Sequence, residues 1–493
     1  MTSFGEHRPA GCLVSQTNSQ MSSDRKFRLC YKPFAVETST PAKDWKFKET
    51  NCGMNVGKTQ CLTEPDWAAF IAIDWADQKH DWAMEVPGQS KRERGQMAHT
   101  PEAIETWVMQ LRERFADRSI AVTLEQSRGA LLFTLSKYAN LVLYPLHPGT
   151  VSYFRQAMYP SGSKSDPIDA DVQIELLVKH RDRLQVWKPD TEETRLLQFL
   201  VEDRRRQVDQ RTGLLNQLIG RLKLYFPQML RWFSSSDSVL MWQFLKHWPD
   251  LQSAQKASRQ KLKAFLVKDA RSCPDDVDEF IGQVRKAIPA TKDGAVVASA
   301  ALFVQELVCQ LQVLRNTIQK YEKRIEAIVQ QHPDFPIVSS FPGIGKALAP
   351  RLIAPLGTQR ERFPDAKSIQ SYSGIAPVRE ASGKREWVHA RWACPKFLKQ
   401  TFQEWAQHSM TRCAWARKHY DSQRARGKAH QAAVRSLAFK WIRILFRCWQ
   451  ARTPYDETRY SESLARRSAP PNTNVQIRWK NVAGFSKLAA FSA

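Results

Sequence analysis

Four acidic residues occupy positions that a metal-dependent reaction would use. Asp74 ends one short apolar run and Glu125 ends another, while Asp166 and Asp169 lie three apart at the expected start of a helix and so share a face. Strand ends converge at one edge of an α/β sheet, so a helix that crosses this edge could gather all four carboxylates. Carboxylates held this close repel one another unless cations offset their charge.

Such a cluster is suited to cutting phosphodiester bonds. Two Mg²⁺ ions roughly 4 Å apart can activate the attacking oxygen and stabilise the leaving oxygen. The spacing therefore predicts a site for two Mg²⁺ ions at Asp74, Glu125, Asp166 and Asp169. The alternative is that these acids are ordinary caps or surface groups, and this fits Asp166 best when it is taken alone.

A serine in the C-terminal half is a candidate nucleophile. Ser382 precedes Gly383 in a loop of small residues. Its basic neighbours in the sequence are Arg379, Lys384, Arg385 and Arg391. A serine oxygen could attack a phosphorus atom there while the cations stabilise the developing charge. A Ser-Gly-Lys loop is also common on protein surfaces, and Ser373 is a competing candidate.

A proline-glycine turn precedes an apolar helix expected over residues 347–356. Gly343, Gly345 and Lys346 in this turn could contact nucleic acid, because the turn is similar to that of a helix-hairpin-helix, whose backbone amides hold a phosphate. It is not a P-loop, since no Ser or Thr follows the lysine. A plain turn before a helix is the alternative.

The segments that carry the acids alternate between strand-like and helix-like patterns, which predicts an α/β domain with a layered sheet over residues 66–185. The expected strands span residues 70–74, 81–86, 119–124 and 141–146. The expected helices span residues 101–115, 128–138 and 166–180. Asp171, just beyond the two aspartates, is expected to be solvated.

The middle of the chain, residues 190–332, is predicted to be helical with coiled-coil helices. Apolar residues recur at alternating spacings of three and four from Ala300 to Ile328, and an earlier segment repeats them every seven residues. These two helices could pair within one chain or between chains. The tryptophans between them, at positions 232, 242 and 248, are interpreted mainly as core or docking surface.

The C-terminal domain, residues 333–455, is predicted to be mostly helical, so the overall fold class is α/β plus α. Its confident helices are expected over residues 347–356, 396–420 and 430–449. Two segments lack sustained periodicity: residues 1–65 are expected to be a disordered extension, and residues 456–493 a weakly structured tail.

The charge balance indicates a polyanionic partner. The chain has 74 Lys and Arg against 49 Asp and Glu, a formal charge of +25, which favours nucleic acid. The nine cysteines are scattered singly, which argues against a zinc site and favours a reducing environment. No run of eighteen apolar residues occurs, so we expect no membrane partner.

At these residues the sequence resembles the DEDD insertion-sequence transposases, whose RNase H/RuvC-like domain carries a Lys-x-Asp-x-x-Asp-Ala motif. That motif stands here at residues 164–170, with Pro167 as a mild departure. The resemblance implies Asp74, Glu125, Asp166 and Asp169 as metal ligands. A Tyr-x-Gly-x-x-Pro segment from Tyr372 and the following Ser-Gly loop match the family's second domain, which implies Ser382 as the nucleophile, although the residues after 385 lack the family's usual glycine.

The resemblance also implies an activity and partners. Family members excise and integrate a mobile element through a covalent serine-DNA intermediate, guided by a structured bridge RNA, and assemble as dimers or tetramers in a bacterial or archaeal cytoplasm. Two alternatives remain open from the sequence. One is a metal-dependent, RuvC-like junction-resolving nuclease without a serine-DNA intermediate. The other is an RNA-binding architectural protein without catalysis.

Overall fold

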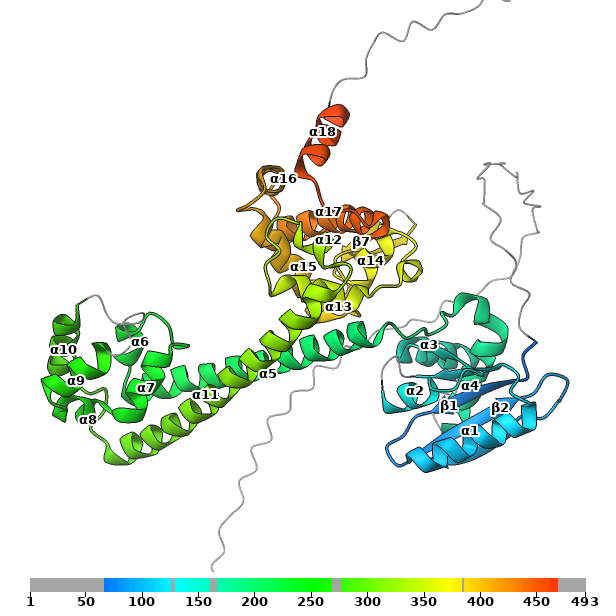
Figure 1. The fold of residues 1–493 in the computed structure, drawn as a ribbon, viewed down its shortest axis with the longest axis horizontal. Helices are drawn as coiled ribbons and strands as arrows, with labels where there is room; N and C mark the ends of the chain where they lie inside the picture. The colour runs from blue at the N-terminus through cyan, green and yellow to red at the C-terminus, as the bar shows by residue number, and fades with distance from the viewer. Residues whose placement is uncertain (1–65, 126–128, 160–165, 268–275, 384, 469–493) are drawn as a thin grey trace, which may run out of the picture. The chain divides into compact units, whose positions relative to one another are not determined.

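The computed structural model describes residues 66–125, 129–159, 166–267, 276–383 and 385–468 (Figure 1). The predicted extension at residues 1–65 therefore lies outside the described residues, as do Lys164, Ser165 and Lys384. Asp166 is described only as the first residue of its helix.

Five strands form one mixed sheet in the order β3-β2-β1-β4-β5. Their bounds are β1 Ala69–Asp74, β2 Lys79–Glu85, β3 Glu93–Ala98, β4 Ile120–Leu124 and β5 Leu141–Pro145. Strand β2 is antiparallel to both β1 and β3, whereas β4 is parallel to β1 and to β5. The predicted mixed α/β region is confirmed, and this arrangement is consistent with an RNase H-like domain.

Alternate residues of β1 face opposite sides of this sheet. Ile71 and Ile73 pack in one core with helix α1 (Pro101–Phe115). Ala72 packs on the other side against Ala170 and Ile174 of helix α4 (Asp166–His180). The helix that begins at the two aspartates therefore covers the face opposite to α1.

Two elements of this region were absent from the sequence prediction. Strand β3 is an edge strand in which only Met97 is buried, and its sequence lacks the alternation of apolar and polar residues that would predict a strand. Helix α3 (Pro148–Met158) begins at a proline and buries only Val151. Between them, helix α2 (Ala130–Leu135) is shorter than the predicted helix over residues 128–138.

Two long helices, α5 (Glu192–Tyr225) and α11 (Gly294–Gln331), pack against each other within the chain. They run antiparallel, because Arg204 pairs with Glu322 at 2.5 Å while Arg221 lies 4.7 Å from the ring of Phe303. The apolar seam predicted from residue 300 onward is largely buried. Of the two pairings left open by the sequence, the structure shows the one within a single chain.

Between them, the described residues 226–267 and 276–293 form five shorter helices. They are α6 (Met229–Trp232), α7 (Val239–His247), α8 (Leu251–Lys256), α9 (Arg259–Val267) and α10 (Val277–Lys286). Trp242 is fully buried in the core that they form with α5 and α11, and Trp232 and Trp248 pack against that core. The interpretation of these tryptophans as core residues is confirmed.

Among the described residues, α11 is the helix that is long and apolar enough, by length and composition alone, to cross a membrane. The core helix of a soluble protein passes the same test. Helix α11 buries Val304, Leu307 and Leu311 in the core shared with α5 and α7. One such helix is weak evidence for a membrane segment.

The C-terminal part is helical apart from one hairpin. Its elements are α12 (Phe335–Ser339), α13 (Leu348–Leu356), α14 (Ala366–Tyr372), β6 (Val378–Ser382), β7 (Arg385–His389), α15 (Lys396–Ser409), α16 (Ala414–Ala425), α17 (His430–Ala451) and α18 (Glu457–Ser468). The single helix predicted over residues 396–420 is wrong, because the chain turns between Ser409 and Ala414. The tail prediction also missed α18, whose residues carry few apolar side chains.

The chain just before α5 is bonded to the C-terminal part. The carboxylate of Asp190 accepts hydrogen bonds from the backbone amide of Thr358 at 2.8 Å and from its hydroxyl at 2.5 Å. It also accepts one from the amide of Thr191, the N-cap of α5. A Cβ at Gly357 would lie 2.1 Å from this carboxylate, so glycine is required for the approach.

Candidate active site

Two of the four predicted acids follow neighbouring parallel strands. Ile73 pairs with Leu124, so Asp74 and Glu125, the next residues, leave the sheet side by side. Side chains alternate between the two faces of a strand, so Asp74 points to the same face as Ala72, and Glu125 to the same face as Ala121. Both alanines pack on the side of the sheet that α4 covers. Both acids are half-buried. The backbone therefore brings these two acids together on the face that α4 covers.

A third acid lies beside them that the sequence analysis did not single out. Asp81 is the register partner of Asp74 across β1 and β2, so both side chains project from the same face. Gln96 donates a hydrogen bond to Asp81 at 2.8 Å. Asp81 also lines a cavity of about 220 Å³ together with Arg94 and Ala170. The sequence signal for it was its place at the start of the strand expected over residues 81–86.

The acids of α4 are engaged by arginines. Asp169 is buried and forms an ion pair with Arg155 of α3. Asp171 accepts hydrogen bonds from Arg94 at 2.5 Å and from Arg92 at 3.4 Å. The expectation that Asp171 is solvated is therefore wrong, because β3 supplies a partner that the sequence analysis did not foresee.

The fit of a metal to this site is partial. The donors are carboxylate oxygens, the ligands that Mg²⁺ prefers. Among the described side chains, which do not include that of Asp166, no group of three or more His, Cys, Asp or Glu is close enough to hold a metal ion. The guanidinium of Arg155 forms an ion pair with the carboxylate of Asp169. A cation that binds this carboxylate would therefore have to displace Arg155.

A buried histidine supports the turn that follows Asp74. The amide of Ala76 donates to Nδ1 of His80 at 3.3 Å, so Nε2 carries the proton and donates to Nδ1 of His99 at 2.8 Å. Burial, and then the nearby His99, lower the pKa of His80 to about 4. His80 is therefore neutral near pH 7 and ties the end of β1 to β3.

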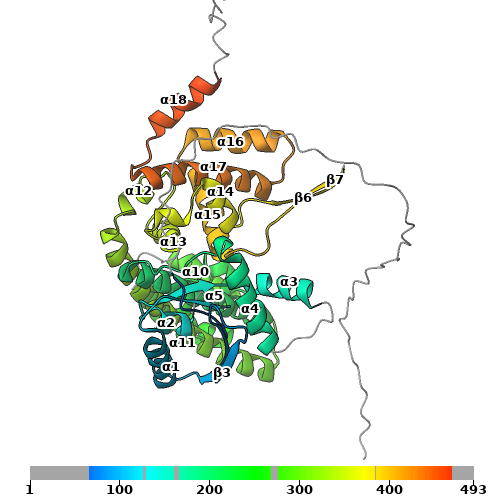
Figure 2. The ribbon, with the colours of Figure 1, turned by 90° about the vertical axis from the view of Figure 1, so that its right-hand side faces the viewer.

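The predicted nucleophile ends the first strand of an exposed hairpin, β6–β7, whose course Figure 2 shows. Ser382 ends β6 and is directly opposite Arg385, the first residue of β7. Gly383, with φ of 58°, supplies the positive φ that two-residue hairpin turns require. The hairpin extends away from helices α14, α15 and α17, and its residues from Arg379 onward are exposed.

The two faces of the hairpin carry different side chains. Residues directly opposite each other project to the same side, so Ser382 shares a face with Arg385, Glu380 and Trp387. On the opposite face Arg379 is paired with Glu386 at 2.7 Å. That ion pair neutralises one face. Among the described residues, Arg385 on the serine face has no carboxylate partner.

The base of the hairpin is held by close packing. A Cβ at Gly374 would lie 2.3 Å from Sγ of Cys394, and φ there is 72°. The backbone carbonyl of Arg391 accepts a hydrogen bond from Nζ of Lys399 at 3.2 Å. Ser373, the competing nucleophile, is fully buried, and its hydroxyl donates to the carbonyl of Gln370 at 3.2 Å. Of the two serines, only Ser382 is exposed.

The predicted glycine turn between α12 and α13 is packed against the protein. A Cβ at Gly343 would lie 2.7 Å from the amide nitrogen of Ser409, and Trp405 donates to the carbonyl of Pro342 at 3.1 Å. Lys346 is exposed and pairs with Glu326 at 2.5 Å. A Cβ at Gly345 would meet nothing within 4 Å. Packing accounts for Gly343, and only Gly345 and Lys346 border open space.

Helices α16 and α17 add a basic surface near buried titratable groups. Burial, followed by the charges of Lys440, Lys428 and Arg426, lowers the pKa of His419 to about 4. Burial and Arg443 lower the pKa of Lys440. Clustered like charges of this kind attract a polyanion.

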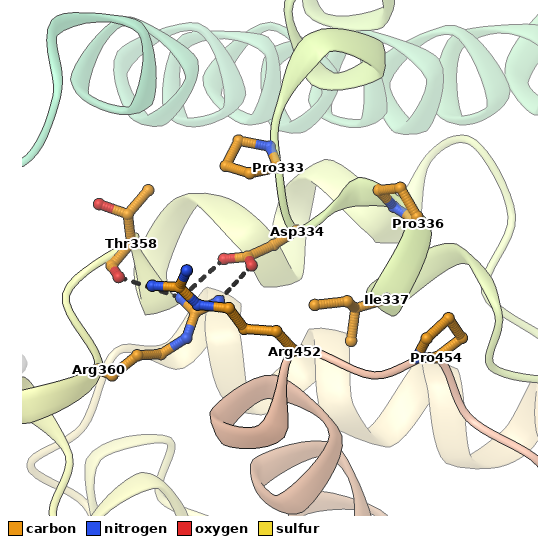
Figure 3. A pocket seen from close by; sticks show the side chains of 8 residues that line it. All are labelled: Pro333, Asp334, Pro336, Ile337, Thr358, Arg360, Arg452 and Pro454. Carbon is orange, nitrogen blue, oxygen red and sulfur yellow. Dashed lines mark hydrogen bonds and ion pairs between the residues drawn. The ribbon is translucent and has the colours of Figure 1, made fainter.

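A separate cavity of about 360 Å³ in the C-terminal part contains none of the predicted residues (Figure 3). Its lining includes Asp334 and Arg360, which are joined by an ion pair at 2.9 Å. Trp449 also donates a hydrogen bond to Asp334 at 3.1 Å. This buried pair is fully engaged and holds α12 to α17, so a structural role accounts for it.

Comparisons with known proteins match two parts of the chain. A family model described as a transposase matches residues 71–227, and one described as the transposase IS116/IS110/IS902 family matches residues 336–421. The first covers the acids and the second covers Ser382. Together the two matches indicate a DNA-cleaving recombinase enzyme of the transposase class.

Relatives match over most of their length. A mini-circle protein of Streptomyces coelicolor assigned as the transposase for IS117 is 28% identical over 83% of this chain and 100% of the relative. A 43.6 kDa protein of insertion element IS110 from the same organism is 25% identical over 79% of this chain and 96% of the relative. The chain belongs to the DEDD-type insertion-sequence transposase family.

Proposed function

We propose that this transposase cleaves and rejoins DNA to excise and integrate an insertion sequence, with a carboxylate metal site and Ser382 as the nucleophile. The observation that carries the proposal is the pairing of β1 with β4, which sets Asp74 beside Glu125 on the α4 face. Residues 66–185 would form the RuvC-like domain, and residues 333–455 the serine domain with its helix-hairpin-helix-like turn, with the helical region 190–332 between them.

The acids would hold the metal. Asp74, Glu125, Asp166 and Asp169 would bind divalent cations, with two Mg²⁺ ions as the expected form. When bound, the metal would polarise the scissile phosphate and stabilise the leaving oxygen. Arg155 keeps Asp169 ion-paired until it is displaced, and His80 holds the turn after Asp74.

The serine would perform a transesterification. The Ser382 oxygen attacks a phosphorus atom, a phosphoserine ester to one DNA end forms, and the P–O bond to the other end breaks to release a hydroxyl. The serine proton passes to solvent or to the leaving oxygen. A hydroxyl of a second DNA end then attacks the phosphoserine and frees Ser382. Arg385, opposite Ser382 in the hairpin, would stabilise the charge that develops on the phosphate.

A bridge RNA would choose the donor and target sites by base pairing. The formal charge of +25 supports extensive contact with nucleic acid backbones, which gives affinity without reading sequence. Gly343, Gly345, Lys346, Arg379, Lys384, Arg385 and Arg391 are the proposed contacts. Packing already accounts for Gly343, so Gly345 and Lys346 carry this part of the proposal.

Dimers and tetramers would bring the two sites of different subunits together. The apolar seam of α11 packs against α5 within the chain, so a contact between subunits would use another surface of α11. Leu302 and Val313 are exposed there and supply apolar area for it.

The test is a search for a covalent protein-DNA adduct. The full chain is incubated with Mg²⁺, its cognate RNA and DNA that spans the element ends, and adducts are resolved under denaturing conditions. We expect an adduct with the wild type and with Ser461→Ala, which removes an exposed serine from α18, and none with Ser382→Ala. Chelation of the metal should abolish the adduct.

Two other outcomes point to the alternatives. Metal-dependent nicks from both the wild type and Ser382→Ala, without any adduct, would make the chain a junction-resolving nuclease. Affinity that persists in chelator, with no strand breaks under any condition, would make it an RNA-binding architectural protein.

A further inference from the structure

Trp387 lies on the same face of the hairpin as Ser382 and is left open to solvent. It is 49% exposed, and its register partner is Glu380. An aromatic side chain can bury about 150 to 250 Å² of its surface in a contact. A half-exposed tryptophan beside the proposed nucleophile is therefore a candidate contact for a binding partner. No ring contact to Trp387 is found within the described part of the chain.

The distance along the strand suits one nucleotide. Arg385 is directly opposite Ser382, and Trp387 is two residues further on, which is about 7 Å at the usual rise of a β-strand. A phosphate at Ser382 and Arg385 would therefore bring a neighbouring base within reach of the Trp387 ring. Glu380 on this face opposes an anion, and its carboxylate lies 3.5 Å from Nε2 of His389, which offsets that charge only when it is protonated.

The hairpin also needs a partner for its own stability. A two-stranded hairpin is marginally stable by itself in water, and this one is exposed on both faces. A flat aromatic ring beside an arginine without a carboxylate partner matches a base and its phosphate better than it matches an apolar protein surface. The exposed Arg385 guanidinium beside the Trp387 ring therefore favours nucleic acid, although Glu380 on the same face cancels its charge.

We propose that Trp387 stacks on an unpaired DNA base next to the phosphate that Ser382 attacks, so that the serine face of the hairpin binds single-stranded DNA at the cleavage point. This inference rests on the proposed function and names the form of DNA that its serine site receives. Base stacking on aromatic side chains is tolerant of sequence, so it adds affinity without selecting a target.

The test uses a short single-stranded DNA oligonucleotide that carries one 2-aminopurine, a fluorescent base whose emission falls when it stacks. The protein is the full chain with Ser382→Ala, so that no cleavage disturbs the measurement. Adding Trp387→Ala should weaken binding by about 5- to 150-fold and abolish the quenching. Trp387→Phe keeps a ring and should retain part of both.

Two matched variants separate stacking from other effects. Val388→Ala truncates a 61% exposed apolar residue on the opposite face of the same strand and should leave affinity and quenching unchanged. Arg385→Ala should lower the slope of log affinity against log salt by about 0.7, the share of one phosphate contact on a single strand. Trp387→Ala should leave that slope unchanged.

Unchanged affinity and quenching in Trp387→Ala would overturn the proposal. The proposal would also be wrong if Trp387→Ala left DNA binding unchanged but altered the association state of the protein, as measured by sedimentation. The serine face would then contact another subunit. The serine chemistry is tested separately by the adduct. If the fluorescence is quenched but no adduct forms, Trp387 stacks on a base and Ser382 is not the nucleophile. If an adduct forms but the fluorescence is not quenched, Ser382 is the nucleophile and the stacking proposal is wrong.

Discussion

The acids on the sheet and the serine on the hairpin differ in how much of the protein holds them. Every residue of β4 before Glu125 is buried, and β1 lies between two other strands. Strand β6, which carries Ser382, has one partner strand, and within the described residues no layer covers the hairpin. The sheet region is therefore fixed by its own core, whereas the serine depends on a ligand or a partner surface to hold it in place.

The largest effect should come from an acid within the fixed region. Asp169→Asn should reduce DNA cleavage by more than about 100-fold, because even the outer partners of metal ligands contribute roughly 10- to 100-fold. Cleavage of labelled end-containing DNA measures this. The matched variant on the same helix is Asp171→Asn, whose carboxylate is bound by Arg92 and Arg94 and should be dispensable for cleavage. Equal losses in both would contradict the assignment.

A stability measurement sharpens the contrast between the two regions. Ile71→Ala removes a fully buried side chain from the central strand and should lower the free energy of unfolding by about 2 to 5 kcal/mol. Val388→Ala in the hairpin should change it by less than about 0.5 kcal/mol. Urea denaturation of both variants gives the values. A hairpin variant as costly as the core variant would show that the hairpin is part of the packed structure.

A smaller effect is expected at the hairpin turn. Gly383→Ala places a Cβ on a residue with φ of 58°, at a cost of about 1 to 2 kcal/mol, without any steric clash. The rate of adduct formation should fall by about 5- to 30-fold while the melting temperature hardly changes. Gly427→Ala, at a positive φ of 76° outside the hairpin, carries the same backbone cost and should leave the adduct rate alone.

The smallest effect concerns His419, a part-buried residue of α16. The folded pKa of His419 is about 4, below its ordinary value of 6.5, because burial and nearby cations disfavour the protonated form. Between pH 6.5 and 4 the unfolded chain takes up a proton that the folded chain does not, so stability falls as the pH falls through this window. His419→Gln should flatten the decline in melting temperature. His80, with a pKa also near 4, should leave a residual slope. An unchanged slope in His419→Gln would mean that His419 is protonated in the fold.

The sequence predicted the acid strands well because buried strands carry continuous apolar runs. It could not predict the partners of the acids. Arg155 lies on a helix that buries a single residue, and Arg94 lies on an edge strand with one buried side chain, so neither element has a strong periodic signal.

The strands of the β6–β7 hairpin were not predicted from the sequence, because they lack the buried apolar runs that revealed the acid strands. Its strands expose nearly every residue, so the pattern of apolar and polar residues carries no information about their structure. What could have revealed it is the two-residue turn at Gly383, flanked by segments of equal length. Ser382 was identified through its motif, while its exposure and the position of Trp387 beside it needed the strand register.

The bond between Asp190 and Thr358 has a consequence for synthesis of the chain. The two residues are 168 positions apart, and both the amide and the hydroxyl of Thr358 bind the same carboxylate. At 5 to 20 residues per second, a ribosome exposes Thr358 roughly 10 to 30 s after Asp190. During that interval the sheet can complete its own core, but the first turn of α5 has no final partner. The nascent transposase would therefore acquire its acid site well before the part that carries its serine is docked.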